Sequence, residues 1–381
     1  MNYTGHTLNQ KPLPRLSLGC MRFTGRENTV ETIRSCVESG ILYLDTCSAY
    51  CYRSEEENSE TWIGEALKGI REKVILSTKC SCGDGVSSVG EYNPSIGFSV
   101  TTADQVRRQI EQSLRRLGTD RLDCYQLWSV HNAVIFNEAF KKGGWLEGVR
   151  KARDEGLIRH IGITGHDGVE GIRRWIQSGC FDMITVPFNL FDISRLEAIR
   201  LAHKKGMAVI GMNPLAGGCL CGQNDVIDES FTDFGVDSTA DLALRFCGSI
   251  RGMTVLCGMN AGGQAVENAG VFARKEWSEE EGLEARRRFI SRLQKAGYNC
   301  SDCRECMPCP QELDIPGVAG LLNYYKLTGS QAVVRYFGER CNFLGNAYKA
   351  NRCDGCGTCG RYCPEDVPVE AVMREAAGFM Q

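Results

Sequence analysis

The sequence predicts an α/β protein, a (β/α)8 TIM barrel followed by a smaller, mainly helical and cysteine-rich domain. Short apolar runs alternate eight times with amphipathic stretches within roughly 250–280 residues, which is the size of such a barrel. The last eighty or so residues depart from this pattern and carry two dense cysteine runs. The alternative is an open doubly wound sheet, but no G-x-G-x-x-G motif follows the first strand, which argues against it. We therefore predict the barrel over residues 1–297 and the second domain over residues 298–381.

The expected strands are short and apolar, and each is followed by a stretch with helical periodicity. A charged helix at 278–295 leads to Ala296-Gly297, where we place the domain boundary, and a helical pattern at 317–338 is interrupted by Gly329. The expected barrel strands cover 16–20, 41–46, 73–79, 123–128, 160–164, 183–188, 208–213 and 253–258. The expected helices cover 29–39, 59–69, 103–117, 137–155, 169–178, 194–205 and 239–246.

The composition favours an ordinary globular protein without a polyanionic partner. Of 381 residues, 43% are hydrophobic and 24% are charged, which is enough for a sizeable core. The net charge of −3 gives no reason to expect nucleic acid or an anionic membrane as partner. Residues 1–19 lack the apolar segment of a signal peptide, and no apolar run approaches the length of a membrane helix. We expect a cytoplasmic protein, and its 21 cysteines indicate metal binding and an anaerobic setting rather than disulfides.

The two cysteine runs predict two [4Fe–4S] clusters. The second run has the C-x2-C-x2-C-x3-C-P spacing of bacterial ferredoxins, in which the fourth cysteine binds the other cluster. The first run has two residues before its last cysteine rather than three, so the crossed pattern is less regular there. Zinc is the rival metal, since structural zinc sites also use C-x2-C pairs. The crossed pattern assigns one cluster to Cys300, Cys303, Cys306 and Cys363, and the other to Cys309, Cys353, Cys356 and Cys359.

Three polar residues lie at the carboxyl ends of expected barrel strands, where barrels carry their catalytic groups. Hydride reduction of a carbonyl leaves an alkoxide that needs a proton, and a phenol with a pKa near ~10 supplies it more readily beside an ammonium. We predict Tyr50 as general acid, Lys79 as the residue that lowers its pKa, and Asp45 as the anchor of Lys79. The structural alternative is that Asp45 caps a loop, Tyr50 packs, and Lys79 is a solvated strand end.

The sequence resembles the aldo-keto reductases along the whole predicted barrel. The segments that carry the resemblance are LYLDTCSAY, VILSTK, IRHIGITGH, VPFNLFD, MNPLAGG and GMNAGGQAVEN. With its cysteine runs, the chain most resembles the bacterial branch of that family that has a C-terminal ferredoxin-like domain with two [4Fe–4S] clusters. The resemblance implies an oxidoreductase that acts on a small-molecule carbonyl or alcohol with NAD(H) or NADP(H).

Trp128 departs from the family pattern, because the family usually places histidine at this position. Tryptophan donates one hydrogen bond but cannot titrate, so it cannot relay a proton. Trp128 stays a candidate catalytic-site residue, since its ring can stack on a planar substrate. His131 follows three residues later, and it either reaches back into the site or is a loop histidine without a catalytic role.

The resemblance also implies a nucleotide site. Thr164 and Asn189 would face the nicotinamide amide. The segment 258–268 contains neither Lys nor Arg, so a 2′-phosphate would lack a cationic partner there, which favours NADH. Arg22 follows the first strand and either clamps a substrate anion or forms a surface ion pair. Gln264, Glu267 and Asn268 would lie beside the adenine and its ribose, and two loops of the phosphate-binding kind contain Asn213, Pro214, Leu215, Gly217, Gly258 and Met259.

Three functions fit these observations. The first is an NAD(P)-dependent carbonyl reductase or alcohol dehydrogenase, whose clusters carry out electron transfer with ferredoxin or another redox protein. The second is a ferredoxin-linked reductase that holds only substrate in the barrel and uses no nicotinamide. The third is an electron-transfer module with a retired barrel, which the intact catalytic residues argue against. A structural role of the clusters also stays open, and the loops that would select a substrate, at 80–100, 129–136 and 219–238, match no motif.

Overall fold

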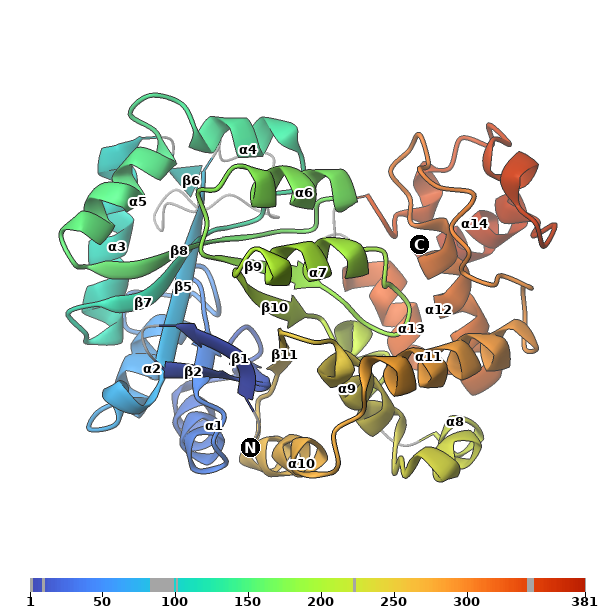
Figure 1. Cartoon of the computed structure of the whole chain (residues 1–381), viewed down its shortest axis with the longest axis horizontal. Helices are drawn as coiled ribbons and strands as arrows, with labels where there is room; N and C mark the ends of the chain where they lie inside the picture. Colours follow the sequence, from blue (N-terminus) through green and yellow to red (C-terminus); the bar gives the residue numbers. More distant parts are fainter. Residues whose placement is uncertain are drawn as a thin grey trace. The chain divides into compact units, whose positions relative to one another are not determined.

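Eight parallel strands among the described residues close into a barrel (Figure 1). The computed structural model describes residues 3–8, 11–82, 99–100, 102–221, 224–340 and 346–380. The strands follow the order β4-β3-β11-β10-β9-β8-β7-β5, and pairing of β4 with β5 closes the ring. The predicted (β/α)8 barrel is thereby confirmed. Its strands are β3 (Leu16–Gly19), β4 (Tyr43–Asp45), β5 (Ile75–Cys82), β7 (Leu122–Leu127), β8 (Ile158–Thr164), β9 (Met183–Pro187), β10 (Ala208–Met212) and β11 (Met253–Gly258).

The chain packs as two compact units. The first contains Met1–Phe188, Ser194–Asn213 and Ile250–Glu276, and the second contains Asn189–Ile193, Pro214–Ser249 and Trp277–Gln381. The domain boundary at 297 stays a prediction. The helices of the first unit are α1 (Arg26–Glu38), α2 (Ser59–Ala66), α3 (Ala103–Leu117), α4 (Ala133–Ala139), α5 (Trp145–Asp154), α6 (Val169–Gln177), α7 (Leu196–Lys204) and α10 (Gly262–Ala273).

Helix α3 shows why the barrel helices form where the sequence predicts them. The Thr102 side chain accepts from the backbone N–H of Gln105, whose own side chain accepts from the backbone N–H of Thr102, which is a capping box. The helix ends at Gly118, whose φ of 59° is left-handed. Its buried apolar residues recur at helical spacing and give it one core-facing side, formed by Val106, Ile110, Leu114 and Leu117.

The single helix predicted at 137–155 was wrong, because the chain forms α4 and α5 there. Asn132 caps α4 by accepting a hydrogen bond from the backbone N–H of Ile135. A turn follows in which the N–H of Gly144 donates to Lys141 O at 2.8 Å, and Gly143 has a φ of 71°. The pair of glycines therefore ends one helix and starts the next, since glycine adopts left-handed backbone without steric cost.

The sequence did not predict the N-terminal hairpin of β1 (Tyr3–Leu8) and β2 (Lys11–Pro14). Leu8 and Leu13 are buried in one apolar cluster with Tyr43, Ile75 and Met183, which are the first residues of three barrel strands. The hairpin therefore covers the amino-terminal end of the barrel, opposite the end where barrels carry their catalytic groups.

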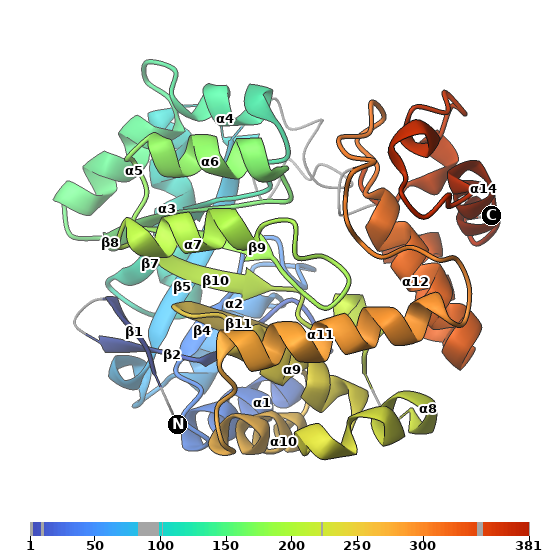
Figure 2. The same cartoon turned by 45° about the vertical axis from the view of Figure 1, so that its right-hand side comes forward.

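The second unit is helical. Asp314 caps α12 through the N–H of Gly317, and α12 ends at Gly329 with a φ of 66°, as the predicted interruption requires. Within this unit α12 lies against both α11 and α14 (Figure 2). None of the helices in the described ranges combines the length and apolarity needed to cross a bilayer. The helices are α8 (Asp225–Asp228), α9 (Thr239–Ser249), α11 (Glu279–Gln294), α12 (Ile315–Thr328), α13 (Gln331–Arg335) and α14 (Val369–Gly378).

Candidate active site

The carboxyl ends of β4 and β7 and the last part of β5 bring the predicted catalytic residues together. Asp45 is the last residue of β4, Tyr50 lies in the loop after it, and Trp128 directly follows β7. The prediction that Lys79 ends its strand was wrong, because β5 continues to Cys82. The extension exists because a short strand, β6 (Ser99–Val100), pairs with the last two residues of β5.

A buried ion pair lies at the centre of this group. The Lys79 ammonium contacts the Asp45 carboxylate, and their side chains are 3% and 4% exposed. The second carboxylate oxygen, Asp45 Oδ1, accepts a hydrogen bond of 2.7 Å from Gln126 Nε2. Buried charges are tolerated only when they are paired and hydrogen-bonded in this way. The buried contact excludes the solvated position of Lys79 in the structural alternative, and the anchoring role of Asp45 stays a prediction.

Gln126 is a site residue that the sequence analysis missed. Besides Asp45, its Nε2 donates to Ser77 Oγ at 2.8 Å, and its Oε1 accepts from Thr185 Oγ1 at 2.8 Å. Both ends of the amide are thus engaged, so the side chain holds Asp45 in one orientation. The available signal was a polar residue inside an apolar strand, two positions before Trp128 and therefore on the same face of β7.

Tyr50 lies directly against Lys79 and Trp128. The Lys79 ammonium is 5.1 Å from the centroid of the Tyr50 ring. The Trp128 ring meets the Tyr50 ring edge-on, with centroids 6.0 Å apart and planes at 87°. An edge-to-face pair of this kind is a favourable aromatic arrangement. The ring at the position of the family histidine thus packs on the phenol without offering a titratable group.

The Lys79 ammonium lowers the pKa of Tyr50, as predicted, but burial acts in the opposite direction. Burial raises the pKa of Tyr50 above its usual value, and the neighbouring Lys79 ammonium opposes only part of this effect. Burial also disfavours the charged form of Lys79, but the Asp45 carboxylate and Tyr50 outweigh it, so the pKa of Lys79 is raised. Tyr50 therefore stays a protonated phenol at neutral pH, and Lys79 stays an ammonium.

His131 contacts residues of its own end of the barrel. Its Nε2 is 2.7 Å from Ser129 Oγ, and its ring stacks on His166 with centroids 5.8 Å apart. The backbone N–H of Val130 donates to Thr164 O at 3.1 Å, which joins this loop to the end of β8. A Cβ at Gly165 would lie only 1.8 Å from Val130 O, so glycine permits this close approach. These contacts hold His131 within the two adjacent loops that follow β7 and β8.

The predicted nucleotide residues of the first unit lie at strand ends or on α10. Thr164 ends β8, Gly258 ends β11, Asn213 follows β10 and Met259 is buried after β11. On α10, the Gln264 side chain accepts from the backbone N–H of Asn260 at 2.9 Å. Glu267 is exposed, whereas Asn268 is buried and its amide is 3.6 Å from Cys257 Sγ.

Arg22 lies beside the segment 258–268. A Cβ built at Gly258 would be 3.5 Å from Cγ of Arg22, so the stem of this exposed side chain runs along the glycine. The segment itself contains no Lys or Arg. The fold therefore brings the aliphatic stem of Arg22 to this segment from the loop after β3, a contact that the sequence did not predict.

The remaining nucleotide candidates belong to the second unit. Asn189 is buried, and its Oδ1 accepts from the backbone N–H groups of Phe191 at 2.9 Å and Asp192 at 3.2 Å. Leu215 and Gly217 form a tight turn after Pro214, in which Leu215 O accepts from the N–H of Gly218 at 2.9 Å. Their approach to the residues of the first unit stays a prediction.

Comparison with known proteins assigns the family. Residues 15–234 match the model of the "Aldo/keto reductase family". The chain belongs to the aldo/keto reductase family. The predicted family and enzyme class, an oxidoreductase, are thereby confirmed. The match ends at residue 234 and so does not include either cysteine run.

Two curated relatives illustrate the similarity within the aldo/keto reductase family. The chain is 28% identical over 211 residues to "Uncharacterized oxidoreductase YqkF" of Bacillus subtilis, covering 55% of this chain and 63% of that protein. It is 28% identical over 226 residues to the "NADH-specific methylglyoxal reductase" of Escherichia coli, covering 55% of this chain and 66% of that protein. The chain thus spans slightly less than two thirds of the length of these relatives.

Solved structures of aldo/keto reductases share the fold. The holo form of an aldo-keto reductase from Bacillus halodurans superposes with a TM-score of 0.60 at 24% identity, over 76% of this chain and 95% of that chain. An aldo/keto reductase from Klebsiella pneumoniae, in complex with NADP and acetate, gives a TM-score of 0.57 at 21% identity, over 74% and 94%. At these identities the likeness shows the fold alone.

The eight cysteines of the two runs line two hollows in the described part of the second unit. The division is the one that the crossed pattern predicts, except that Cys306 lines both. Apolar side chains make up most of the remaining walls, among them Ile315 and Val369, which line both hollows, and each hollow also has charged residues, such as Arg304 in the first and Asp354 in the second. The first hollow is lined by Cys300, Cys303, Cys306 and Cys363, and the second hollow by Cys306, Cys309, Cys353, Cys356 and Cys359.

The thiols are not gathered around a single point. Within the described ranges, no three His, Cys, Asp or Glu side chains form a group that could hold one metal ion. A four-iron cluster makes a different demand, because each thiolate binds its own iron and the sulfurs stand around the cluster. The ligand role of the eight cysteines stays a prediction.

Proposed function

We propose that this aldo/keto reductase family member reduces a small carbonyl compound, or oxidises the corresponding alcohol, with a nicotinamide nucleotide. The observation that carries the proposal is the buried pair of Asp45 and Lys79 against the Tyr50 phenol. Stabilisation of the fold does not by itself explain this pair, because buried ion pairs often contribute little net stability. A charged pair beside a protonated phenol is instead suited to proton transfer.

In the proposed reaction Tyr50 gives its proton to the carbonyl oxygen. A nicotinamide bound at this site would supply a hydride to the carbonyl carbon, and the Tyr50 proton would then complete the alcohol at the carbonyl oxygen. The raised pKa of Tyr50 suits this direction, because an alkoxide is still a far stronger base than a phenolate. Lys79 stabilises the phenolate that remains, and Asp45 with Gln126 holds Lys79 in place.

Asn189 and Thr164 are the residues that we propose for the nicotinamide amide. The side-chain oxygen of Asn189 already accepts two backbone hydrogen bonds within its own loop. Its Nδ2 is therefore the group available to donate to the carboxamide oxygen. The loops that include Asn213, Pro214, Leu215 and Gly217, and Gly258 and Met259, are proposed for the phosphates, and Gln264, Glu267 and Asn268 for the adenosine.

NADH should bind about 10-fold more tightly than NADPH. A 2′-phosphate needs a charged hydrogen-bond partner worth about 1.5–3 kcal/mol, and residues 258–268 supply none. Anaerobic titration followed by nucleotide fluorescence measures both dissociation constants, and methylglyoxal is a reasonable first substrate in a subsequent turnover screen. Arg22→Gln is the informative comparison. Tighter binding of NADPH that is lost in Arg22→Gln would show that Arg22 supplies the charge, and binding of neither nucleotide would contradict the proposed cofactor.

We further propose that the two cysteine hollows hold [4Fe–4S] clusters. Thiolates are the usual ligands of such a cluster, and mostly apolar walls limit its contact with solvent, which tunes its reduction potential. The clusters would pass single electrons, to or from ferredoxin or another redox protein in a reducing, anaerobic cytoplasm. Cys300, Cys303, Cys306 and Cys363 would hold one cluster, and Cys309, Cys353, Cys356 and Cys359 the other.

Reconstituted protein should contain about eight iron atoms per chain, and Cys363→Ser and Cys309→Ser should each remove about half of them. Each variant removes one thiolate from a different proposed cluster, so visible absorbance should fall in parallel. Iron and sulfide assays under strict anoxia provide the measurement. Cys221→Ser, an exposed cysteine outside both runs, is the matched control and should retain full iron. Zinc in place of iron, with no visible absorbance, would contradict the cluster assignment.

A ferredoxin-linked reductase without nicotinamide is a second candidate function. Trp128 favours it, because this residue replaces the titratable group of the family and packs on the proton donor. The absence of Lys and Arg from residues 258–268 also favours it. Under this candidate the clusters would supply the electrons, so the origin of the hydrogen on the product carbon distinguishes the two functions.

A further inference from the structure

The two C-x2-C-x2-C segments share a backbone conformation but not the residues that adopt it easily. The third and fifth positions of both segments have positive φ, at 57° for Asp302 and 64° for Arg304, and at 69° for Gly355 and 67° for Gly357. Glycine adopts this conformation without steric cost, whereas it is unfavourable for a residue with a long side chain. The first segment therefore has a strained backbone at two positions where glycine would be unstrained. This strain suggests that the side chains at these positions have a role.

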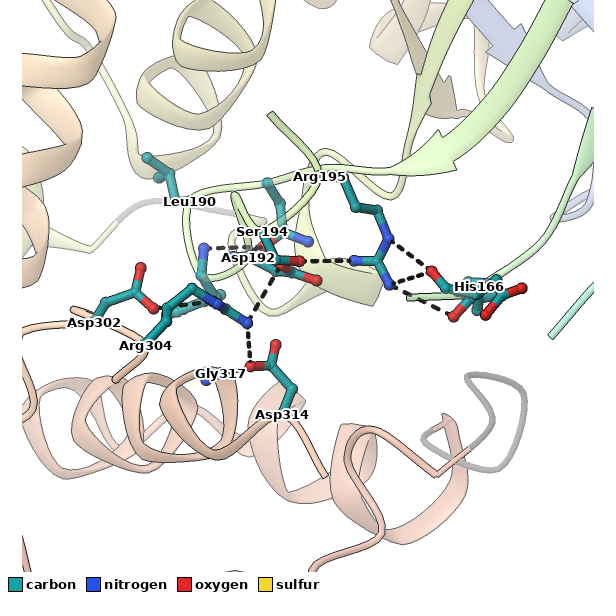
Figure 3. Close-up of polar contacts among 12 residues, drawn as sticks. His166, Leu190, Asp192, Ser194, Arg195, Asp302, Arg304, Asp314 and Gly317 are labelled. Atoms are coloured by element: carbon teal, nitrogen blue, oxygen red, sulfur yellow. Dashed lines mark hydrogen bonds and ion pairs between the residues drawn. The ribbon is translucent and has the colours of Figure 1, made fainter. Parts of the chain in front are cut away.

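Arg304 lies at the centre of a cluster of carboxylates within the second unit (Figure 3). Its guanidinium is 3.0 Å from Asp302 Oδ1, 2.5 Å from Asp314 Oδ1 and 3.9 Å from Asp192 Oδ1. The three carboxylate side chains are between 5% and 9% exposed, so solvent screens these charges weakly. Asp302 also pairs with Arg286 of α11. The strained positions thus place Asp302 and Arg304 in a largely buried charge network.

This network reaches the loop Asn189–Ile193, which belongs to the same unit. Arg286 Nε donates to Leu190 O at 2.9 Å, and Arg304 faces Asp192. Phe191 lies 5.6 Å from the ring of Phe289 on α11 and 5.6 Å from that of Tyr324 on α12. Arg286, Arg304 and the loop's own Phe191 therefore tie the loop to the rest of this unit. Its first residue, Asn189, is the one proposed for the nicotinamide amide.

We propose that Arg304 is a positioning residue that couples the cysteine segment 300–306 to the loop Asn189–Ile193. Arg304 lies between Cys303 and Cys306, so filling the first hollow would fix its backbone and, through its side chain, the loop. Such coupling is reciprocal, so a nucleotide that needs the ordered loop would bind more tightly when the cluster is present. This inference rests on the proposed function for the cluster and the nucleotide.

Hydrogen–deuterium exchange of the peptide that contains residues 189–193 tests the coupling without any nucleotide. In wild-type protein, removal of iron by a chelator should speed exchange of this peptide by roughly 10-fold. Arg304→Gly should show the fast exchange with iron still bound, and chelation should then add little. Glycine occupies the corresponding position of the second segment, so this variant suits the backbone and should keep its full iron content. Arg304→Gln removes the same charge without changing the backbone type.

Arg352→Gln is the matched control, because Arg352 is an exposed arginine directly before the second cysteine run. It should leave exchange of the loop peptide unchanged. In parallel, the NADH dissociation constant should rise roughly 10-fold in wild-type protein without iron and in both Arg304 variants. Unchanged loop exchange in both Arg304 variants, or faster exchange only where iron is also lost, would overturn the proposal. If no protein binds NADH, the proposed cofactor fails, while the exchange data still decide the coupling.

Discussion

Tyr50→Phe should lower kcat/KM for carbonyl reduction by about 10²–10⁴-fold, the usual contribution of a general acid. The variant keeps the ring that faces Lys79 and Trp128 and removes only the hydroxyl that carries the proton. NADH affinity and thermal stability should change little, so the loss should appear in the chemical step. Steady-state kinetics together with nucleotide titration provide the measurement.

Tyr52→Phe is the control for this variant. Tyr52 lies in the same loop, and its hydroxyl donates to Glu55 Oε1 at 3.1 Å rather than to the site. It should retain wild-type activity. Because burial raises the pKa of Tyr50, reduction should be insensitive to the ionisation of this phenol through neutral pH, and the rate should fall only in the alkaline range as the proton is lost. A kcat/KM for Tyr50→Phe within about threefold of wild type would remove Tyr50 from the mechanism.

Lys79→Met should lower the free energy of unfolding by about 3–5 kcal/mol, because it leaves the Asp45 carboxylate buried without its charged partner. Turnover should fall as well, since the phenolate of Tyr50 would lose its stabilising charge. Denaturant unfolding followed by circular dichroism measures the first effect. The double variant Asp45→Asn/Lys79→Met should recover part of the loss, because an asparagine oxygen can still accept from Gln126.

The pH dependence of stability provides a second check on the same pair. The pKa of Lys79 is raised in the folded protein, so the ion pair contributes its full stability below the unfolded lysine pKa of about 10.4 and loses it at higher pH. The difference between wild type and Lys79→Met should therefore be constant near neutral pH and shrink above about pH 10. A cost below about 1 kcal/mol for Lys79→Met would mean that Asp45 is not held as a buried charge.

The barrel could be predicted from the sequence because its signal is local and repeated. Each strand is a short apolar run followed by an amphipathic helix, and eight such units leave few alternatives. The hairpin of β1 and β2 could not be predicted, because its stability comes from Leu8 and Leu13 packing on residues far away in the sequence. The break between α4 and α5 was readable in Gly143 and Gly144, which the apparent periodicity of 137–155 concealed.

The residues of the candidate site and the effect of Lys79 on Tyr50 could be predicted from the sequence, but the net shift of the Tyr50 pKa could not. Asp45, Tyr50 and Lys79 follow from strand ends and from the family resemblance. The direction of the Tyr50 pKa depends on burial, which is a property of the fold and not of the neighbouring residues in sequence. Gln126 was missed for a similar reason, because only the barrel register brings it to Asp45.

In the cysteine segments, too, the spacing of the residues could be read from the sequence, but the roles of the residues between the cysteines could not. Spacing alone suggested which thiols share a cluster. The roles of Asp302 and Arg304 required the backbone, since only their left-handed conformation distinguishes them from ordinary surface charges beside a metal ligand. The second segment has Gly355 and Gly357 at the corresponding positions, so the first segment has charged residues where glycine would adopt the same backbone without strain.

Reduction with NADH that carries deuterium at both C4 positions of the nicotinamide tests whether the nucleotide is the hydride donor. Mass spectrometry should find one deuterium per molecule on the carbinol carbon of the alcohol, and none there when unlabelled NADH is used in heavy water. Tyr50→Phe should slow the appearance of this product without changing the position of the label. Hydrogen from the solvent on that carbon, with reduced ferredoxin as the electron source and no need for NADH, would contradict this role of the nucleotide.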